Sequence, residues 1–559
     1  MNTKIWLKPT LCFTLAALSQ YAAASGYHFG TQSVGSQSTA NSSAAEAADP
    51  STLFYNGAGL TKLDGTQATV NINLVKPSVK YQNAKAYYAD GTEITTNASN
   101  TGAGETSGKI ASDVQAVPHL YASHKINENV AVGLGAFVPF GSGTEYSRDS
   151  VLRYNLNELG LQTLAVQPTV AFKVHPQHSF AVGLVAQHTE AELRQYANFG
   201  ANLTAGLKAQ TAALSQLGIT TSAQANAALT QISTDITQLN AAIAQVAANN
   251  EDTSALQTQL TALTTRQQQL ARGSAALSAI EQATANNTNG NGAADGYARV
   301  KGDDWGFGYT LSWLWDVNDA VRVGANYRSP VKHTLEGTSE WHLSDGLFNN
   351  AALGSALQSQ IRAAGYVANE NASVKITTPE SLSVHGMWAV DDKWKVFGDA
   401  TWTRHSRFNQ ANLYLGDAKT VATDVNGVNQ SNQTILQPNW RNTWKVAVGV
   451  SYQWSKPLQL RAGVAYDQSP VKNASYRMTT LPDNDRIWLS LGAKYDFNAN
   501  HSLNVAYSHL FIKNAKAEVN GYCGGSAATS VACVSSKTRG SADYRSRADI
   551  LGLQYTYKF

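Results

Sequence analysis

Residues 551–559, LGLQYTYKF, carry the pattern that decides the fold. Leu551, Leu553, Tyr555, Tyr557 and Phe559 take every second position, with small or polar residues between them. Because a β-strand points successive side chains to opposite faces, the segment has one apolar face and one small or polar face. The same alternation recurs upstream through most of the chain. It predicts a transmembrane β-barrel, apolar toward lipid and polar toward the lumen, that residues 551–559 close. A large soluble β-protein is the alternative.

The composition agrees with a barrel. Only 14% of the 559 residues are charged and the net charge is +3, which gives no basic face for nucleic acid. The 43 Gly, 24 Tyr and 12 Trp suit tight turns and aromatic girdles at the membrane interfaces. Beyond the N-terminal segment, no apolar run reaches the about 18 residues that a membrane-spanning helix needs.

Residues 1–24 have the pattern of a secretory signal peptide. Lys4 and Lys8 make a basic start, an apolar stretch follows, and the alanines at 22–24 offer a small-residue cleavage site. We expect the mature chain to begin at Ser25 and to reach the bacterial outer membrane.

Residues 25–66 are rich in Ser, Ala, Gly and Thr and show no alternation. That composition is typical of a flexible linker. The segment nevertheless keeps Tyr27, Phe29 and the apolar run 53–55, which a linker does not need. Its length suits a plug inside a barrel lumen, and we expect it to be such a hatch.

Residues 67–559 are expected to form the barrel, as about fourteen antiparallel strands. An even number is usual for bacterial barrels, with short turns at the periplasmic rim and long loops outside. The connections alternate in this way, for example the turn at 318–319 and the long connection 82–112. The expected strands are 67–81, 113–125, 128–140, 161–175, 178–195, 295–317, 319–338, 371–391, 393–412, 438–455, 457–475, 484–497, 500–519 and 541–559.

Residues 196–294 form the longest connection, and their pattern differs from the rest. Leu229, Ile232 and Ile236 begin a series of apolar residues at steps of three and four, which resumes after a turn at 249–252. This periodicity predicts two antiparallel helices outside the barrel, and a third is conceivable over 203–217. The insertion is either a surface decoration or an arm that captures apolar molecules or a partner.

Two further features concern cysteine and proline. Cys523 and Cys533 are predicted to form a disulfide, as expected for an exported protein, and no His lies between them to suggest a metal. Pro139, near the outer end of the third strand, indicates a kink or gap in the wall, because proline removes a ladder hydrogen bond. We expect no metal and no cofactor.

An enzymatic barrel would need His paired with Asp, Asn or Ser at the outer rim. His188 and the pair His405-Ser406 are present, but isolated His in strands are usually wall residues. The sequence therefore does not predict an enzyme.

A set of motifs, in order along the expected strands, resembles the FadL family of outer-membrane transporters of long-chain fatty acids and other hydrophobic compounds, which includes the TodX hydrocarbon channels. The resemblance covers most of the mature chain. In Asn56-Gly57-Ala58, Gly57 stands where the family's hatch motif usually has Pro. The motifs are Gly26-Tyr27, Asn56 to Leu60, Pro139 to Gly141 with Thr144 to Tyr146, Gly302 to Gly308, Tyr327 to Lys332, Asp467 to Val471 and Asp483 to Ser490.

The resemblance implies a fourteen-stranded barrel plugged by an N-terminal hatch and working without an energy source. Ligand would land in an apolar groove among the outer loops, pass to a pocket at the hatch N-terminus, and leave through the kinked third strand into the membrane. Burial of each CH₂ contributes about 0.8 kcal/mol, so these are successive low-energy positions for an apolar molecule. Tyr27, Phe29, Phe140 and Phe307 are expected to contact the ligand.

The resemblance also bears on the ligand's head group. Fatty-acid members hold the carboxylate with an Arg on strand five and a Lys on strand nine, and Glu190 and Asn412 fall at those places here. Arg194, Arg404 and Arg407 lie close enough for a small register error to bring one in, whereas Glu190 would repel a carboxylate. Long-chain fatty acid is the expected cargo.

A neutral aromatic or aliphatic hydrocarbon is the alternative cargo, and a porin-like adhesin that uses the helical insertion is the alternative class. Outer-membrane lipid is the other expected partner. We expect a monomer, because the strand pattern closes on itself.

Overall fold

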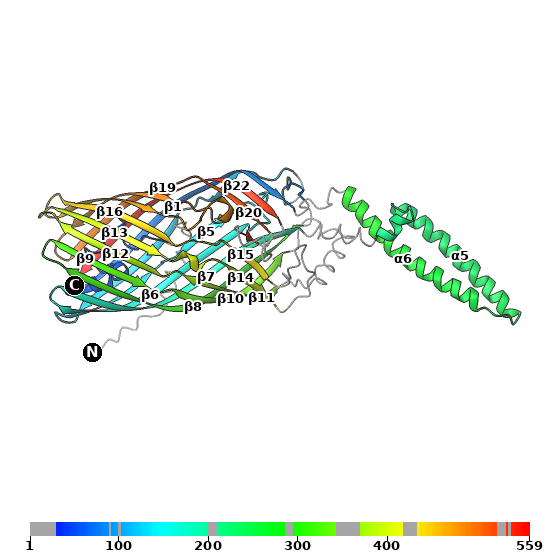
Figure 1. Ribbon diagram of the computed structural model, residues 1–559, viewed down its shortest axis with the longest axis horizontal. Coiled ribbons are helices and arrows are strands. Elements are labelled where there is room, and N and C mark those ends of the chain that lie inside the picture. Colours follow the sequence, from blue (N-terminus) through cyan, green and yellow to red (C-terminus); the bar gives the residue numbers. More distant parts are fainter. Residues whose placement is uncertain are drawn as a thin grey trace, which may run out of the picture.

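The computed structural model describes residues 29–88, 91–98, 102–198, 211–285, 295–342, 369–416, 433–521, 533–534 and 538–559. The chain closes into an antiparallel barrel (Figure 1), and we call each of its fourteen passes through the wall a stave. No helix in the described part of the chain is both long and apolar enough to cross a membrane. Residues 1–28, Cys523 and the side chain of Cys533 lie outside the description, so the signal peptide and the disulfide stay predictions.

Each stave pairs with the next in chain order, and the first pairs with the last, from Gln67 opposite Lys558 to Tyr87 opposite Arg539. The prediction of fourteen strands closed by the last one is therefore confirmed. The staves are β1 (Thr66–Tyr87), β3 (Gln115–Lys125), β4 (Val130–Phe137) with β5 (Gly141–Glu145), β6 (Glu158–His175), β7 (His178–Asn198), β8 (Asp295–Asp316), β9 (Val321–Arg328) with β10 (Val331–His342), β11 (Asn369–Thr378) with β12 (Ser381–Ala389), β13 (Trp394–Thr403) with β14 (Ala411–Leu415), β15 (Gln433–Gln437) with β16 (Thr443–Gln453), β17 (Leu458–Asp467), β18 (Arg486–Asp496), β19 (His501–Ile512) with β20 (Ala515–Asn520), and β22 (Arg539–Lys558). Two short strands extend the sheet. β2 (Gly108–Ala111) pairs with β1, and β21 (Cys533–Val534) pairs with β15 and β20.

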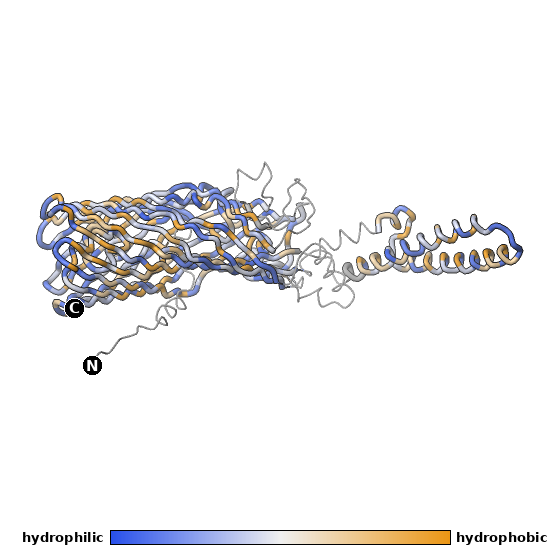
Figure 2. Tube along the Cα trace, turned by 90° about the horizontal axis from the view of Figure 1, so that it is seen from below, coloured by the Kyte–Doolittle hydropathy of each residue, from blue (hydrophilic) through white to orange (hydrophobic). Residues whose placement is uncertain are grey.

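The alternation in sequence becomes an inside and an outside. On β22, Leu551 and Leu553 are exposed on the outer face, whereas Gly552 and Gln554 between them are buried in the lumen. Figure 2 shows the same alternation as hydrophobic and hydrophilic positions along the wall. Trp394 and Trp454 are exposed beside the short turns, where an aromatic girdle meets the membrane interface.

The first described residues, 29–63, fill the lumen with short helical turns: α2 (Val34–Gln37), α3 (Thr52–Tyr55) and η1 (Gly57–Lys62). Almost all of these residues are buried, although many are Ser, Thr or Ala. Small side chains let the hatch backbone approach the wall. At Gly463 of β17 even a methyl group would overlap the backbone of Thr39, so only glycine fits the wall at this contact.

The helices expected between 196 and 294 are α5 (Ser222–Ala248) and α6 (Ser254–Ala285), which stand away from the barrel (Figure 1). Thr221 and Gln224 form a capping box that begins α5. Apolar side chains including Leu214, Ile232 and Leu270 pack between the helices. The prediction of a helical insertion is confirmed. The third helix is seen only over 211–216, because 199–210 lie outside the described residues.

Candidate functional site

The third stave is interrupted where β4 ends at Phe137 and β5 begins at Gly141. Phe137 lies opposite Ala165 of β6 and Gly141 lies opposite Gln162, so three residues of the stave face two of β6. The extra residue makes a β-bulge, after which the residues that face the lumen change from odd to even numbers. Pro139 lies at the centre of this break and has no N–H to offer a neighbour.

The break leaves a gap in the ladder of the wall. On the far side, β3 pairs with β4 only over Leu120–Lys125. Among the described strands, residues 115–119 of β3 have β1 as their partner and none on the other edge. Among the described strands, β5 in turn pairs only with β6. In the described part of the chain, β3 and β5 are therefore not joined by main-chain hydrogen bonds above the break, although the Glu105 N–H donates to Asp149 and the Val151 N–H donates to Glu105 in the loops beyond it.

The start of the described hatch covers this break from inside. The Phe29 N–H donates to the carbonyl oxygen of Pro139 at 3.0 Å. The side-chain amide of Gln32 donates to the carbonyl oxygens of Phe29 at 2.7 Å and Val138 at 2.8 Å. The Phe29 ring is buried and stacks on His119 of β3, with 6.1 Å between the ring centroids. Movement of the hatch N-terminus would therefore uncover the break.

Two apolar clusters meet at the break. We call the cluster that contains Val138 the lower cluster and the cluster that contains Phe140 the upper cluster, so the break lies between them. The lower cluster includes Phe29, Val75, Val117, Val138, Trp488, Leu510 and Ile550. The upper cluster consists of Phe140, Leu156, Leu436, Trp440, Val471, Met478, Leu481 and Val519.

A cavity lies beside the two clusters. Its lining includes Leu481 from the upper cluster and Ile512, which packs against the lower one. Ser142 and Thr144 of β5 line the same cavity. The cavity thus lies next to both clusters and to β5, and Asp483 and Arg486 add charged groups to its lining.

A cationic group lies at the lower cluster. The Lys445 Nζ of β16 is 4.6 Å from the centroid of the Trp488 ring, and a methyl group built on Gly30 would lie 3.6 Å from it. No described residue gives Lys445 a hydrogen bond or an ion pair, and the buried Trp488 indole N–H has no partner among the described residues. Two donors without an acceptor at the end of an apolar cluster fit a ligand that ends in an acceptor such as a carboxylate.

The acidic side chain nearest to Lys445 along the strands also faces a second cation. Asp467 is the cross-strand neighbour of Lys445, and Arg486 of β18 is the next neighbour in the same row. Arg486 lies 3.8 Å from Asp467 and also pairs with Asp483. Asp467 therefore has a second cation to face, and Lys445 is left without a carboxylate within 4 Å. Lys445 shares its lumen-facing parity with the small residues Ala447 and Gly449, so alternation in the sequence does not distinguish it as a site residue.

Phe29 and Phe140 are the predicted site residues that the structure brings to the break, while Tyr27 lies outside the described residues. Phe307 is 75% exposed on the outer face of β8 and does not reach the clusters. It has the position of a lipid-facing side chain.

Glu190 and Arg194 lie on β7 away from the clusters. Glu190 pairs with Lys301 at 2.6 Å, and Arg194 pairs with Glu145 at 2.7 Å. The lumen-facing residues at this height are Gln187 and Thr189, which both contact His333. Glu190 is one residue beyond Thr189 on β7, so its side chain lies on the other face of the strand and not in the lumen.

Arg404, Arg407 and Asn412 are likewise engaged elsewhere. Both arginines bind the carboxylate of Glu380, at 3.1 and 2.8 Å. Asn412 accepts from the side-chain amide of Gln410 at 2.6 Å. None of the three belongs to either apolar cluster.

The hatch motif attaches the hatch to the wall. The Asn56 amide donates to the carbonyl oxygen of Trp313 at 2.9 Å, and its oxygen accepts from the Ala58 N–H at 3.0 Å. The Gly57 N–H donates to the Ser312 hydroxyl at 3.0 Å. A methyl group on Gly57 would lie 3.0 Å from Thr169, so this residue is also in close contact with the wall.

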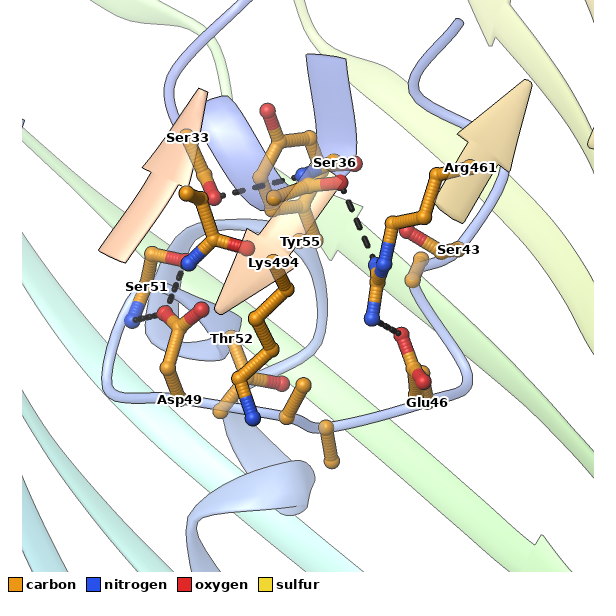
Figure 3. A pocket seen from close by; sticks show the side chains of 15 residues that line it. Ser33, Ser36, Ser43, Glu46, Asp49, Ser51, Thr52, Tyr55, Arg461 and Lys494 are labelled. Carbon is orange, nitrogen blue, oxygen red and sulfur yellow. Dashed lines mark hydrogen bonds and ion pairs between the residues drawn. The ribbon is translucent and has the colours of Figure 1, made fainter. Parts of the chain in front are cut away.

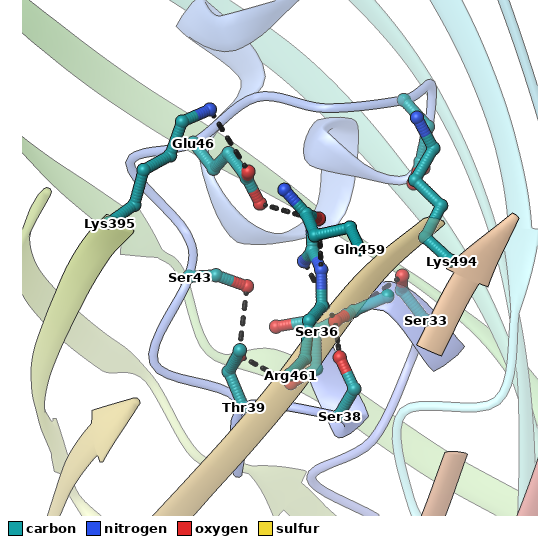
Figure 4. A network of polar contacts seen from close by, with 12 residues as sticks. Ser33, Ser36, Ser38, Thr39, Ser43, Glu46, Lys395, Gln459, Arg461 and Lys494 are labelled. Carbon is teal, nitrogen blue, oxygen red and sulfur yellow. Dashed lines mark hydrogen bonds and ion pairs between the residues drawn. The ribbon is translucent and has the colours of Figure 1, made fainter. Parts of the chain in front are cut away.

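Charged groups fix the lower side of the hatch (Figures 3 and 4). Glu46 pairs with Arg461 of β17 at 2.8 Å and with Lys395 of β13 at 3.5 Å. Burial opposes ionisation of Glu46, but Arg461 and Lys395 outweigh it, so the pKa of this carboxyl lies below its usual value. The hatch is therefore held by ionised groups at neutral pH.

Gln554 of the closing strand binds the hatch as well. Its side-chain oxygen accepts from the Ser33 hydroxyl at 3.1 Å, the Val34 N–H at 3.0 Å and the Gly35 N–H at 3.1 Å. Its amide donates to Asp49 at 2.8 Å. In the described part of the chain, no group of three or more His, Cys, Asp or Glu side chains is arranged to hold a metal ion.

A model of the family described as "Outer membrane protein transport protein (OMPP1/FadL/TodX)" matches residues 15–559. The chain is similar to a protein of Neisseria meningitidis serogroup B described as a candidate outer membrane protein, with 46% identity over 541 residues, 96% of this chain and 95% of that one. It is similar to the long-chain fatty acid transport protein of Escherichia coli O6:H1, with 30% identity over 230 residues, 41% of this chain and 48% of that one. Among solved structures, a FadL homologue of Pseudomonas aeruginosa has the same fold, with a TM-score of 0.69 and 20% identity over 96% of this chain and 100% of that one.

Proposed function

Since this chain belongs to the OMPP1/FadL/TodX family and is an outer-membrane transporter of hydrophobic compounds, not an enzyme, we propose that it carries long-chain fatty acids and releases them sideways through the break in the third stave. The break itself is the observation that carries the proposal. It lies between two apolar clusters, it interrupts the ladder of the wall, and the hatch covers it from inside.

The physical route follows from the order of the apolar surfaces. An acyl chain gains about 0.8 kcal/mol for each CH₂ removed from water, first in the upper cluster and then in the lower one. Phe29 occupies the lower cluster in the described state. An acyl chain that displaces Phe29 would also weaken the contact of the hatch with Pro139, which opens the way to the membrane. No energy source is needed, because each step exchanges one apolar environment for another.

The head group distinguishes fatty acids from neutral hydrocarbons. The Lys445 ammonium and the Trp488 N–H both lack a described acceptor beside the lower cluster. A carboxylate supplies that acceptor and a hydrocarbon does not. Lys445 therefore takes the role that the family resemblance assigned to residues on other strands, and a fatty acid is the cargo that the site fits best.

Deleting Pro139 tests lateral release. Because three residues face two at the break, removing one makes the third stave continuous with β6 and brings β4 and β5 into the same parity. We expect the barrel to fold, and uptake of labelled oleate by cells to fall at least tenfold, close to the level of cells without the protein. Heat-dependent migration of the folded barrel on gels measures folding independently of uptake.

The matched control is deletion of Asn250, which lies in the turn between α5 and α6 and far from the wall. This variant should take up oleate like the wild type. Normal uptake by a folded barrel without Pro139 would refute lateral release. Equal uptake by cells with and without the wild-type protein would refute transport of this cargo.

A further inference from the structure

The outer face of the barrel becomes basic where the first and last staves leave the apolar band. On β1 the outward residues are the exposed Val70, Ile72 and Leu74, followed by Lys76 and Lys80. On β22 the outward apolar residues are likewise followed, toward the loops, by exposed arginines at 547 and 545. Beyond the apolar band, Lys76 is opposite Asp549, Ser78 is opposite Arg547, and Lys80 is opposite Arg545.

Three of these cations lie in one cross-strand row. Lys80 of β1 is paired with Lys109 of β2 on one side and with Arg545 of β22 on the other. Directly opposite side chains have Cβ atoms about 5 Å apart, and like charges in such a pair destabilise the sheet. All three side chains are exposed, and no described residue gives any of them an ion pair or a side-chain hydrogen bond. We call Lys80, Lys109 and Arg545 the basic row.

The cations on the outer face of β7 and β8 are paired differently. On β7 and β8, Lys301 pairs with Glu190 at 2.6 Å and Arg299 pairs with Glu192. These are also cross-strand neighbours or diagonal neighbours, but of opposite charge. The basic row therefore differs from the β7–β8 surface in having no described ion pair, and its positive charge is available to an anion from outside the chain.

The height of the row identifies the anion. Lys80 lies six residues beyond Leu74, the last apolar outward residue of β1, which corresponds to about 15 Å along the barrel axis for a tilted strand. That distance takes the row out of the hydrocarbon and into the head groups of the outer leaflet. Charged side chains at this depth meet lipid phosphates, which Arg and Lys bind through charge-assisted hydrogen bonds.

We propose that the basic row is a binding site for the phosphates of a phosphorylated glycolipid in the outer leaflet. Lys85 and Arg547, exposed next to the row on the same strands, add to its positive charge. The lipid's acyl chains then lie against Val70, Ile72 and Leu74 below it. Lys109 is on β2, which among the described strands pairs only with β1, so the bound lipid borders the side of the barrel where the wall is interrupted.

The test is native mass spectrometry of the purified full-length protein in detergent, titrated with lipid A that carries two phosphates. Replacing the row by K80Q, K109Q and R545Q together should weaken binding about 100-fold, because each basic group at an anionic lipid surface contributes roughly a factor of five. The control variant K301Q, K332Q and K375Q removes the same charge from β8, β10 and β11 and should bind like the wild type. Heat-dependent gel migration verifies that both variants are folded barrels.

Two further arms separate the possible sources of phosphate. Lipid A without its phosphates should bind all three proteins weakly and equally, and millimolar inorganic phosphate should not displace the intact lipid. Equal affinity of the wild type and the row variant for phosphorylated lipid A would overturn the proposal. Displacement by inorganic phosphate would overturn it too, because the site would then recognise a free anion.

Discussion

At the scale of single residues, Lys445 decides between two kinds of cargo. Replacing it with Met keeps the aliphatic length but removes the donor, so the carboxylate of a fatty acid loses its partner beside Trp488. We expect Lys445→Met to reduce uptake of labelled oleate about tenfold, since a charge-assisted hydrogen bond contributes about 1.5–3 kcal/mol. Uptake of a neutral aromatic hydrocarbon should not change. Lys375→Met, on the outer face, is the matched control.

Two outcomes would contradict the assignment of Lys445 to the carboxylate. If oleate uptake of Lys445→Met equals that of the wild type, Lys445 does not hold the carboxylate. If uptake of both compounds falls together, the substitution has damaged the barrel and not the recognition of the head group, and the carboxylate assignment fails.

Glu46 makes the attachment of the hatch depend on pH. A carboxyl whose pKa is lower in the folded state than its usual 4.5 stabilises that state above the usual value, and the contribution is lost as the pH falls through the folded pKa. Protease access to the wild-type hatch should therefore stay low at neutral pH and rise only below about pH 4.5. Glu46→Gln should loosen the hatch at neutral pH by about 3 kcal/mol, because it leaves the buried Arg461 without its carboxylate.

The pH profile separates this effect from general acid damage. In Glu46→Gln, protease access should change little with pH, whereas Asp235→Gln, on the exposed helix α5, should keep the wild-type profile. A wild-type profile in Glu46→Gln would show that another group controls the attachment of the hatch.

At the scale of elements, the helical arm and the barrel are separable. The helices α5 and α6 bury their apolar residues against each other and against Leu214, and not against the staves. Deleting 200–290 and joining the ends with a short Gly-Ser linker should leave folding and oleate uptake within about twofold of the wild type. Whole-cell uptake and gel migration measure the two properties. Loss of uptake by the folded deletion variant would assign the arm a part in capturing the ligand.

The elements were also the part that the sequence predicts best. Alternation is local, so residues 551–559 are enough to recognise a strand, and a shift of helical period is enough to recognise the arm. The face that each side chain takes is harder, because one residue of slip exchanges lumen and lipid. Glu190 was placed near the carboxylate site for this reason, whereas Gln187 and Thr189 face the lumen. The sequence alone does not place Lys445 beside Trp488, because that contact depends on the exact register of β16, β17 and β18.

At the scale of the whole molecule, the wall, the hatch and the apolar clusters are joined in one closed barrel. The staves are paired along most of the wall, and the break between β4 and β5 is the place where the hatch N-terminus contacts the wall through Phe29 and Gln32.

Gln554 has a consequence for how the protein is assembled. Its side chain accepts from three groups of the hatch while its main chain belongs to the strand that completes the ring, more than 500 residues later in the chain. The last strand to be synthesised therefore completes both the ring and the binding of the N-terminal segment, which links closure of the barrel to attachment of its plug.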